Sequence, residues 1–319
     1  MTDAPKRRET VLIVIPVRNR PRLVLKTLDT LLAQTHPPDE LVVVDDGSTD
    51  DDETAQSVEA WIRDRAPAFP AGVVRQAHGG LSSARNTGFA AGGRTEWVSF
   101  LDSDDLWPPD LLARCLAAAE RSPDAVAVTA DQRFVDGSTG EELLQDASGM
   151  ETEPANWLLR NEPCLCSCTL FRSDLVRAQG GFDEQLFTGE DIQLLFPLTL
   201  EGPWLHSPGE PVVYQRDTPG GEDANNSRRF EDRFRRWARI YDALLARPDL
   251  RATVDPTLRR ERLWYFWYEA GEELFVARNR TEARGCFARA LHYKPLHRKT
   301  WSRWAKCFTP YREKKRVAP

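Results

Sequence analysis

The sequence lacks any long apolar run. No stretch approaches the roughly eighteen consecutive apolar residues that a membrane-spanning helix needs. The residues before position 11 are mostly charged or polar, so they also lack the apolar core of a secretory signal peptide. We therefore expect a cytoplasmic protein with no membrane-spanning helix, one that can still touch the inner face of the membrane.

The cysteine spacing typical of zinc sites is missing too. Three of the six cysteines alternate, at Cys164, Cys166 and Cys168, but no Cys-x₂-Cys pair occurs. In a cytoplasmic protein these thiols should be free. The pattern of residues 164–171 predicts a strand, on which the three cysteines would share one face and pack as small buried side chains.

Two nucleotide-binding signatures are also absent. The turn after the first predicted strand, residues 11–15, begins Pro16-Val17-Arg18-Asn19 and contains no glycine. A nucleotidyltransferase needs a glycine-rich loop there to hold phosphates, and a dinucleotide-binding dehydrogenase needs Gly-x-Gly-x-x-Gly after a strand. The sequence therefore argues against both enzyme classes.

The chain contains enough apolar residues for a large core, and its charged residues are unevenly distributed. Its 319 residues are 41% hydrophobic and 29% charged, which is typical of globular proteins. The net charge of −6 combines 19 basic and 38 acidic residues in positions 1–227 with 24 basic and 11 acidic residues in 228–319. We expect an acidic domain over 1–227 and a basic, aromatic-rich helical extension over 228–319. The extension could contact an anionic membrane surface or form a homodimer, and we expect no nucleic-acid partner.

Strand and helix patterns alternate along the acidic domain. Apolar runs predict strands at residues 11–15, 41–44, 73–74, 97–101, 125–130, 164–171 and 212–214, and a hairpin joins 132–135 to 142–144. Apolar residues at helical spacing lie between most of these runs. This order predicts an α/β fold with a mostly parallel, Rossmann-like sheet flanked by helices.

Acidic turns follow two of the predicted strands. Asp45 and Asp46 come after residues 41–44, and Asp102 and Asp104 come after residues 97–101. The carboxyl ends of the strands in such a sheet are where ligands bind. Two carboxylates this close stay ionised most easily when a cation such as Mg²⁺ or Mn²⁺ meets them, although solvated loop and helix-capping acids have the same local pattern.

Five motifs in a fixed order make the pattern specific. They are Ile-Pro-Val-Arg-Asn (15–19), Val-Val-Asp-Asp-Gly-Ser-Thr-Asp (43–50), Gly-Leu-Ser-Ser-Ala-Arg-Asn-Thr-Gly (80–88), Phe-Leu-Asp-Ser-Asp-Asp (100–105), and Gly-Gly-Phe-Asp-Glu (180–184) leading to Gly-Glu-Asp (189–191). Together they resemble the family 2 glycosyltransferases, over about residues 11–217. The resemblance implies the GT-A fold and transfer of a sugar, with inversion, from a nucleotide-diphosphate donor to a hydroxyl of a glycan or lipid-linked acceptor. A UDP-sugar is favoured and a GDP-sugar is possible, and the expected role is cell-surface glycan synthesis.

The resemblance also assigns roles to single residues. Asp46 would accept a hydrogen bond from a ring N–H of uracil or guanine. Asp104, with Asp102, would hold Mn²⁺ or Mg²⁺ against the donor diphosphate. Asp191 would be the general base, with Glu190 beside it, and an ordinary helix-capping role is the alternative for Asp191. The residues expected to contact the donor are Pro16, Val17, Arg18, Asp46, Arg85, Asp102 and Ser103.

One departure from the family concerns the metal. Relatives carry a metal-binding histidine after the last strand, whereas this chain has Tyr214-Gln215-Arg216-Asp217, so Asp217 or water would take that position. We expect His206 to lie in a loop with a structural role. Two alternatives stay open: a chain with this fold that acts without catalysis, through its basic helical extension, and a nucleotidyltransferase, which the missing glycines disfavour.

Overall fold

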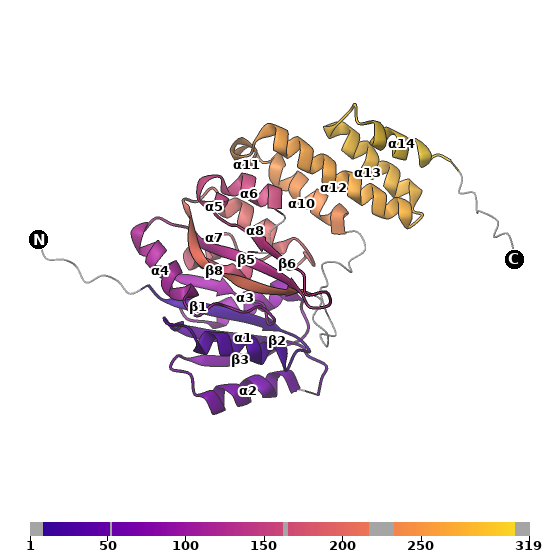
Figure 1. Cartoon of the computed structure of the whole chain (residues 1–319). Helices are drawn as coiled ribbons and strands as arrows, with labels where there is room; N and C mark the ends of the chain where they lie inside the picture. Colours follow the sequence, from indigo (N-terminus) through magenta and orange to yellow (C-terminus); the bar gives the residue numbers. More distant parts are fainter. Residues whose placement is uncertain (1–8, 52, 162–164, 217–232, 310–319) are drawn as a thin grey trace, which may run out of the picture. The chain divides into compact units, whose positions relative to one another are not determined.

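The computed structural model describes residues 9–51, 53–161, 165–216 and 233–309. The chain divides into two compact units, residues 1–226 and 227–319 (Figure 1). Each unit has its own packed core and is described by itself.

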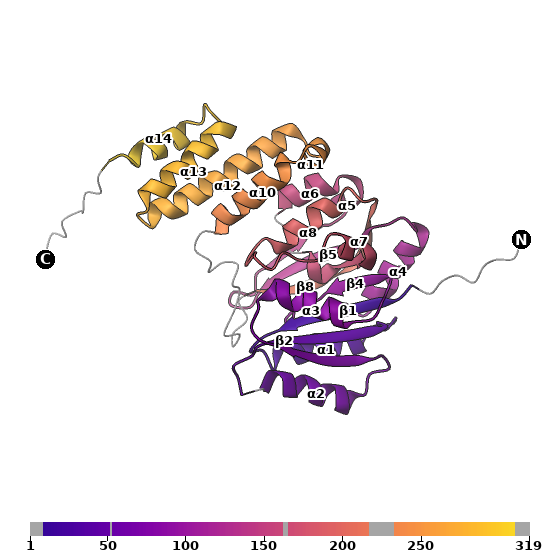
Figure 2. The same cartoon turned by 180° about the vertical axis from the view of Figure 1, so that it is seen from behind.

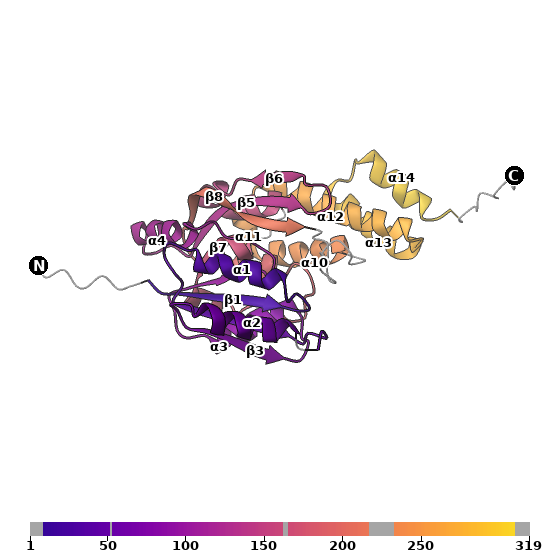
Figure 3. The same cartoon turned by 60° about the horizontal axis from the view of Figure 1, so that its bottom comes forward.

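The first unit is built on an eight-stranded sheet. In chain order its strands are β1 (Val11–Val17), β2 (Glu40–Asp46), β3 (Ala71–Gln76), β4 (Trp97–Phe100), β5 (Ala127–Asp136), β6 (Glu142–Gln145), β7 (Thr169–Arg172) and β8 (Trp204–Arg216). The order across the sheet is β3-β2-β1-β4-β7-β5-β6, and β8 pairs with the other side of β5 (Figures 1 and 3). The first four strands of this order are parallel, whereas β7 is antiparallel to both of its neighbours.

Helices cover both faces of the sheet. They are α1 (Leu23–Leu32), α2 (Glu53–Arg65), α3 (Leu81–Ala91), α4 (Leu111–Arg121), α5 (Gly149–Thr152), α6 (Pro154–Asn161), α7 (Ser173–Ala178) and α8 (Glu190–Leu198). Right-handed crossovers put α1 and α2 on one face and α3, which precedes the reversal of strand order at β4, on the other (Figures 1 and 2). The predicted α/β sheet is confirmed, and the turn after β1 and the turn after β4 open at the same edge.

Every residue of β1 is buried, which explains its unbroken apolar run. Gly88 lies on the face of α3 that packs against the sheet. It lets the helix backbone come so close to β1 that an added Cβ would lie 2.4 Å from Val14 Cγ1. This close approach fixes the helix that carries Arg85.

Three local predictions were wrong. Residues Cys166–Cys168 form a 3-10 turn, η1, so the cysteines do not alternate along a strand, and Cys164 lies outside the described residues. The segment predicted as two strands, 125–130 and 132–135, is the single strand β5 with an irregularity between Ala130 and Gln132. His206 lies within β8, not in a loop. The five cysteines in the described part of the chain are free thiols, as expected.

The second unit is helical. Its helices are α10 (Arg233–Ala246), α11 (Pro248–Thr253), α12 (Pro256–Val276), α13 (Arg280–Tyr293) and α14 (Arg298–Lys306). Helix α12 packs against both α10 and α13, with the Tyr241 and Phe266 rings stacked 4.7 Å apart and Phe287 over Gly271. Among the described residues, no helix has the length and apolar character to cross a membrane.

Candidate functional site

Arg20 connects the turn after β1 to the acidic turn after β4. Its Nη1 lies 2.9 Å from Asp104 Oδ2 and donates to Ser103 Oγ at 3.4 Å. The Arg20 and Asp104 side chains are each only 18% exposed, so this ion pair is poorly screened by solvent. The Arg20 guanidinium therefore pairs with Asp104, the carboxylate that was predicted from the sequence to bind a metal.

Arg85 links two further acids. This side chain, only 2% exposed, projects from α3 and donates from Nη2 to Asp102 Oδ1 at 2.8 Å and from Nη1 to Glu190 Oε1 at 3.1 Å. Burial alone would lower the arginine pKa, but the neighbouring Cys166, Asp102 and Glu190 outweigh it and hold the pKa above its usual value. One buried cation thus joins the turn after β4 to the first turn of α8.

Asp191 follows Glu190 in that first turn. The helix begins after Gly189, whose φ of 78° favours glycine, so Gly189 and not Asp191 occupies the capping position. Asp191 Oδ1 accepts a hydrogen bond from the adjacent Ile192 N–H at 2.8 Å. Burial, reinforced by the like charge of Glu190, raises the pKa of Asp191 to about 7. A carboxylate with this pKa is matched to general-base work near neutral pH.

Asp46 is buried and already holds the loop that leads into α3. Its oxygens accept hydrogen bonds from Gln76 Nε2, Gly79 N, Gly80 N and, at 2.8 Å, His78 Nδ1. The His78 side chain is 54% exposed. A ring N–H of a nucleotide base would compete with His78 for Asp46, and the predicted role in base recognition stays a prediction.

The other expected donor-binding residues lie near the same edge. Pro16 and Val17 are buried as the last residues of β1, and Arg18 follows directly with its Nε 3.4 Å from Gly47 O. Through Arg18, Arg20 and Arg85, the ends of β1, β2, β4 and α8 form one connected group of polar side chains. These contacts join the segment after β1 to the turn after β2 and to the acidic turn after β4.

Ser167, which no sequence pattern singled out, holds the residues beneath the acidic turn in place. Its Oγ accepts the Asp102 N–H at 3.0 Å and donates to Asp105 Oδ2, while its carbonyl accepts Trp107 Nε1–H at 2.6 Å. Burial and the charges of Asp104 and Asp102 raise the pKa of Asp105 well above its usual value. Asp105 is thus a structural acid. A lone serine in an apolar stretch carries no sequence signal for this role.

Asp102 and Asp104 suit a divalent cation. Burial raises the pKa of Asp104, Arg20 opposes that effect and the charge of Asp102 adds to it. A partly buried pair of carboxylates with oxygen donors is the ligand type that Mg²⁺ and Mn²⁺ prefer. Asp217, expected in place of the family histidine, lies outside the described residues.

Both the sequence and the fold are similar to those of glycosyltransferases. The sequence profile of Glycosyl transferase family 2 matches residues 12–179. An uncharacterized glycosyltransferase of Nostoc sp. is 36% identical over 126 residues, which are 40% of this chain and 37% of that protein, so the chain spans little more than a third of that relative.

Two solved structures share the fold. S. aureus TarS 1-349 in complex with UDP superimposes with a TM-score of 0.65 at 18% identity, over 94% of this chain and 89% of that one. The mannosyltransferase PcManGT of Pyrobaculum calidifontis, in complex with GDP-Man and Mn²⁺, gives a TM-score of 0.60 at 19% identity, over 95% and 85% of the two chains. At these identities the likeness concerns the fold.

Proposed function

We propose, since this chain belongs to glycosyl transferase family 2 and has the GT-A fold, that it moves a sugar from a nucleotide-diphosphate donor to an acceptor hydroxyl. The observation that carries the proposal is the Arg85 bridge. It holds Asp102, on the donor side by resemblance, and Glu190, next to the base candidate Asp191, on one buried guanidinium. This contact supports a site in which the proposed donor-binding and proton-accepting groups are held close together.

The proposed donor is a nucleotide-diphosphate sugar that binds at the acidic edge of the sheet. The UDP bound to the S. aureus protein, and the GDP-Man bound to the Pyrobaculum protein, support a nucleotide-diphosphate leaving group. We assign the nucleotide to the residues after β1 and β2, with UDP favoured. A divalent cation on Asp104 and Asp102 would supply Lewis-acid stabilisation of the charge that develops on the diphosphate.

Asp191 takes the proton of the acceptor hydroxyl as the hydroxyl oxygen attacks the anomeric carbon. Glu190 is held by Arg85 and is therefore less available for proton transfer, which leaves Asp191 as the base. A single displacement with one base, and no carboxylate acting as nucleophile on the donor side, inverts the anomeric configuration. We propose a glycan or lipid-linked acceptor in cell-surface glycan synthesis.

The proposal is tested by nucleotide release. We expect the purified chain with Mn²⁺ to liberate UDP or GDP from at least one sugar nucleotide in a panel supplied with acceptor glycans. The Asp191→Asn variant should lower turnover by about 10²-fold or more, because the acceptor proton loses its base. Binding of UDP, followed by the thermal midpoint, should be retained, since Asp191 does not contact the nucleotide in this assignment.

Asp174→Asn is the matched control. Asp174 accepts the N–H of the next residue, Leu175, at 2.9 Å, in the same way as Asp191 does from Ile192, but it lies exposed on α7. Its substitution should leave turnover unchanged. If neither UDP nor GDP raises the midpoint and no donor is consumed, the chain is a non-catalytic member of the fold instead.

A further inference from the structure

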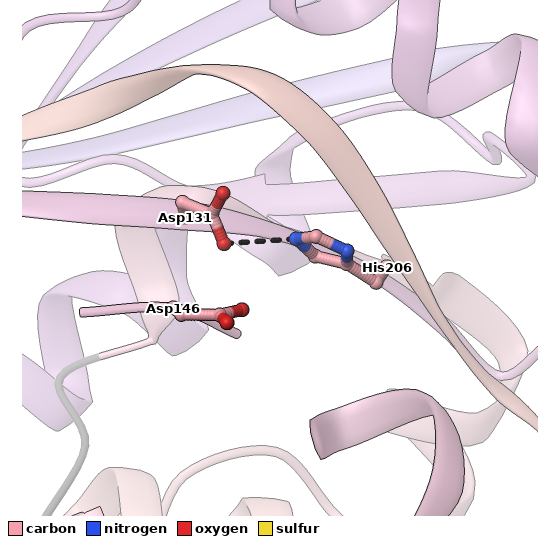
Figure 4. A group of neighbouring side chains, drawn as sticks. All are labelled: Asp131, Asp146 and His206. Carbon is pink, nitrogen blue, oxygen red and sulfur yellow. Dashed lines mark hydrogen bonds and ion pairs between the residues drawn. The ribbon is translucent and has the colours of Figure 1, made fainter. Parts of the chain in front are cut away.

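A second group of potential metal ligands lies on another part of the sheet. Asp131 belongs to β5, His206 to β8, and Asp146 follows β6, yet one ligand atom from each residue lies within 4.8 Å of the other two. Figure 4 shows the three side chains turned toward the same space. Nothing in the spacing along the chain indicates this meeting, since the residues are far apart in sequence.

An irregular strand pairing brings Asp131 to His206. Thr129 is paired with His206 and Ala130 with Ser207, but the next pair is Gln132 with Val212, so the single residue Asp131 lies opposite four residues of β8, three more than regular pairing would give. Bulges of this kind redirect side chains locally. Asp131 Oδ1 lies 2.8 Å from His206 Nε2 (Figure 4).

The turn after β6 supplies the third ligand. Ala147 N donates to Asp131 Oδ1 at 2.8 Å, which fastens the turn to β5, and Ser148 N donates to Asp146 Oδ1 at 2.7 Å, which orients that carboxylate. Asp146 is exposed, whereas Asp131 and His206 are partly buried. The group is therefore anchored on the sheet side and open to solvent on the other, which leaves room for water as a further ligand.

This group is separate from the Asp102 and Asp104 pair. The acidic turn meets β8 at Val213, through the pairing of Leu106 with that residue. Val213 is opposite Arg133 on β5, and His206 is opposite Thr129, so the two places are four β5 residues apart, or about 13 Å along the strand. A cation bound to one group would not share ligands with the other.

The local charge favours a divalent cation. Asp131 and Asp146 bring two negative charges, and Glu151 lies near enough to act electrostatically on His206. Arg114 is a positive side chain that acts on Asp131. With a neutral imidazole, the three carboxylates and one guanidinium leave an excess of two negative charges. Mixed imidazole and carboxylate donors are typical of Zn²⁺ and Mn²⁺ sites more than of Mg²⁺ or Ca²⁺ sites.

We propose that Asp131, Asp146 and His206 form a second cation site for a transition metal of the Zn²⁺ or Mn²⁺ class. The cation takes one imidazole nitrogen and one oxygen from each carboxylate, and water completes its coordination. The bound cation links the turn that precedes α5 to β5 and β8. It thereby fixes the start of the segment that contains α5 and α6. The site is independent of the proposed sugar transfer.

The test measures Zn²⁺ binding to tag-free full-length protein by isothermal titration calorimetry. The Asp104→Asn background removes the first site, and we expect it to keep one equivalent of bound Zn²⁺. Adding His206→Ala or Asp146→Asn should weaken that binding by about 10²-fold, since each change removes a direct ligand. Co²⁺ in place of Zn²⁺ should give visible absorption bands that the same changes abolish.

The controls separate ligand loss from misfolding. Asp146 is exposed, so Asp146→Asn should leave the circular dichroism spectrum and thermal midpoint of the apo protein unchanged. His292→Ala, which removes an exposed histidine from α13, should leave Zn²⁺ binding intact. The proposal is overturned if Asp104→Asn alone abolishes all Zn²⁺ binding, or if Asp146→Asn and His206→Ala leave the affinity in that background unchanged.

Discussion

Asp191 and Glu190 are neighbours in the chain with different surroundings. Glu190 meets the guanidinium of Arg85, which stabilises its charge, whereas Asp191 is desolvated and repelled by Glu190. Two carboxylates with distinct environments can divide their tasks, one as a fixed counter-ion and one as a base. This division is set by the buried Arg85.

The pKa of Asp191 predicts a pH profile. We expect kcat/KM for the best donor and acceptor to rise with pH through about 7, because only the ionised Asp191 accepts a proton. The folded-state pKa lies above the ordinary value of 3.8, so the stability that Asp191 contributes is fully present below about pH 4 and is lost as the pH rises through about 7. A profile that is flat between pH 5.5 and 8 at constant ionic strength would exclude Asp191 as the base.

Arg20 competes with a metal for Asp104. Its guanidinium lies 2.9 Å from Asp104 Oδ2, where a bound cation would feel strong repulsion. Arg20→Met should therefore tighten Mn²⁺ binding by about tenfold, or about 1.4 kcal/mol, measured by titration calorimetry with UDP present. Arg22→Met, two residues away and exposed, should leave the affinity unchanged. Equal or weaker Mn²⁺ binding by Arg20→Met would show that the ion pair does not oppose the metal.

At the scale of elements, α3 positions the site because it lies unusually close to the sheet. The helix starts at the Asp46 loop, carries Arg85 one turn later and contacts β1 and β2 through Gly88. The loop, the arginine and the close contact are therefore parts of one rigid unit. Sequence patterns located the helix but not its distance from the strands.

Gly88→Ala should destabilise the first unit. The added Cβ would lie 2.4 Å from Val14 Cγ1 and 2.9 Å from Val44 Cγ2, so β1 or α3 must shift, at a cost of about 1–3 kcal/mol. Gly285→Ala is the matched helical control, because Gly285 is exposed on α13 with nothing within 4 Å of an added Cβ. That change should stabilise α13 by up to about 1 kcal/mol. Calorimetry of the full chain should show a lower thermal midpoint for the first unit in Gly88→Ala and a higher one for the helical unit in Gly285→Ala.

For the whole molecule, the two units differ in charge as well as in fold. The first unit is acidic, and the helical unit is basic, with Trp301 and Phe308 about half exposed and the Arg284 guanidinium over the Phe308 ring. Exposed aromatics among basic side chains are typical of surfaces that meet anionic lipid headgroups. Membrane contact through this unit stays a prediction.

That prediction can be measured by sedimentation with vesicles. The full chain should bind vesicles containing anionic lipid at 0.05 M salt, release them at 0.5 M salt, and ignore neutral vesicles. The double variant Arg298→Gln, Lys299→Gln should bind at least tenfold more weakly, because two exposed charges at the start of α14 are lost. Arg22→Gln, Lys26→Gln makes the same charge change in the first unit and should bind like the parent chain. Salt-independent binding would contradict an electrostatic contact.

The sequence by itself determined the layout of the first unit. The strand runs, the helices between them and the acidic turns at the strand ends follow from local apolar periodicity, which the structure confirms for the elements from β1 to α4. The five motifs were enough to place the chain in its family, because their order along the chain is itself informative. The same patterns failed at residues 166–168, which form a 3-10 turn, and in β8, whose pairing with β5 is irregular. Apolar periodicity along a short segment does not indicate either feature.

Only the tertiary structure decided which side chains meet. Arg85 was expected to contact the nucleotide, and the fold places it between Asp102 and Glu190. No sequence pattern indicated the contacts of Ser167 or the meeting of Asp131, Asp146 and His206. The physical reason is that local patterns record burial and periodicity, whereas contacts between distant segments depend on strand register and on helix-to-sheet distance. Those quantities are set by packing across the whole core.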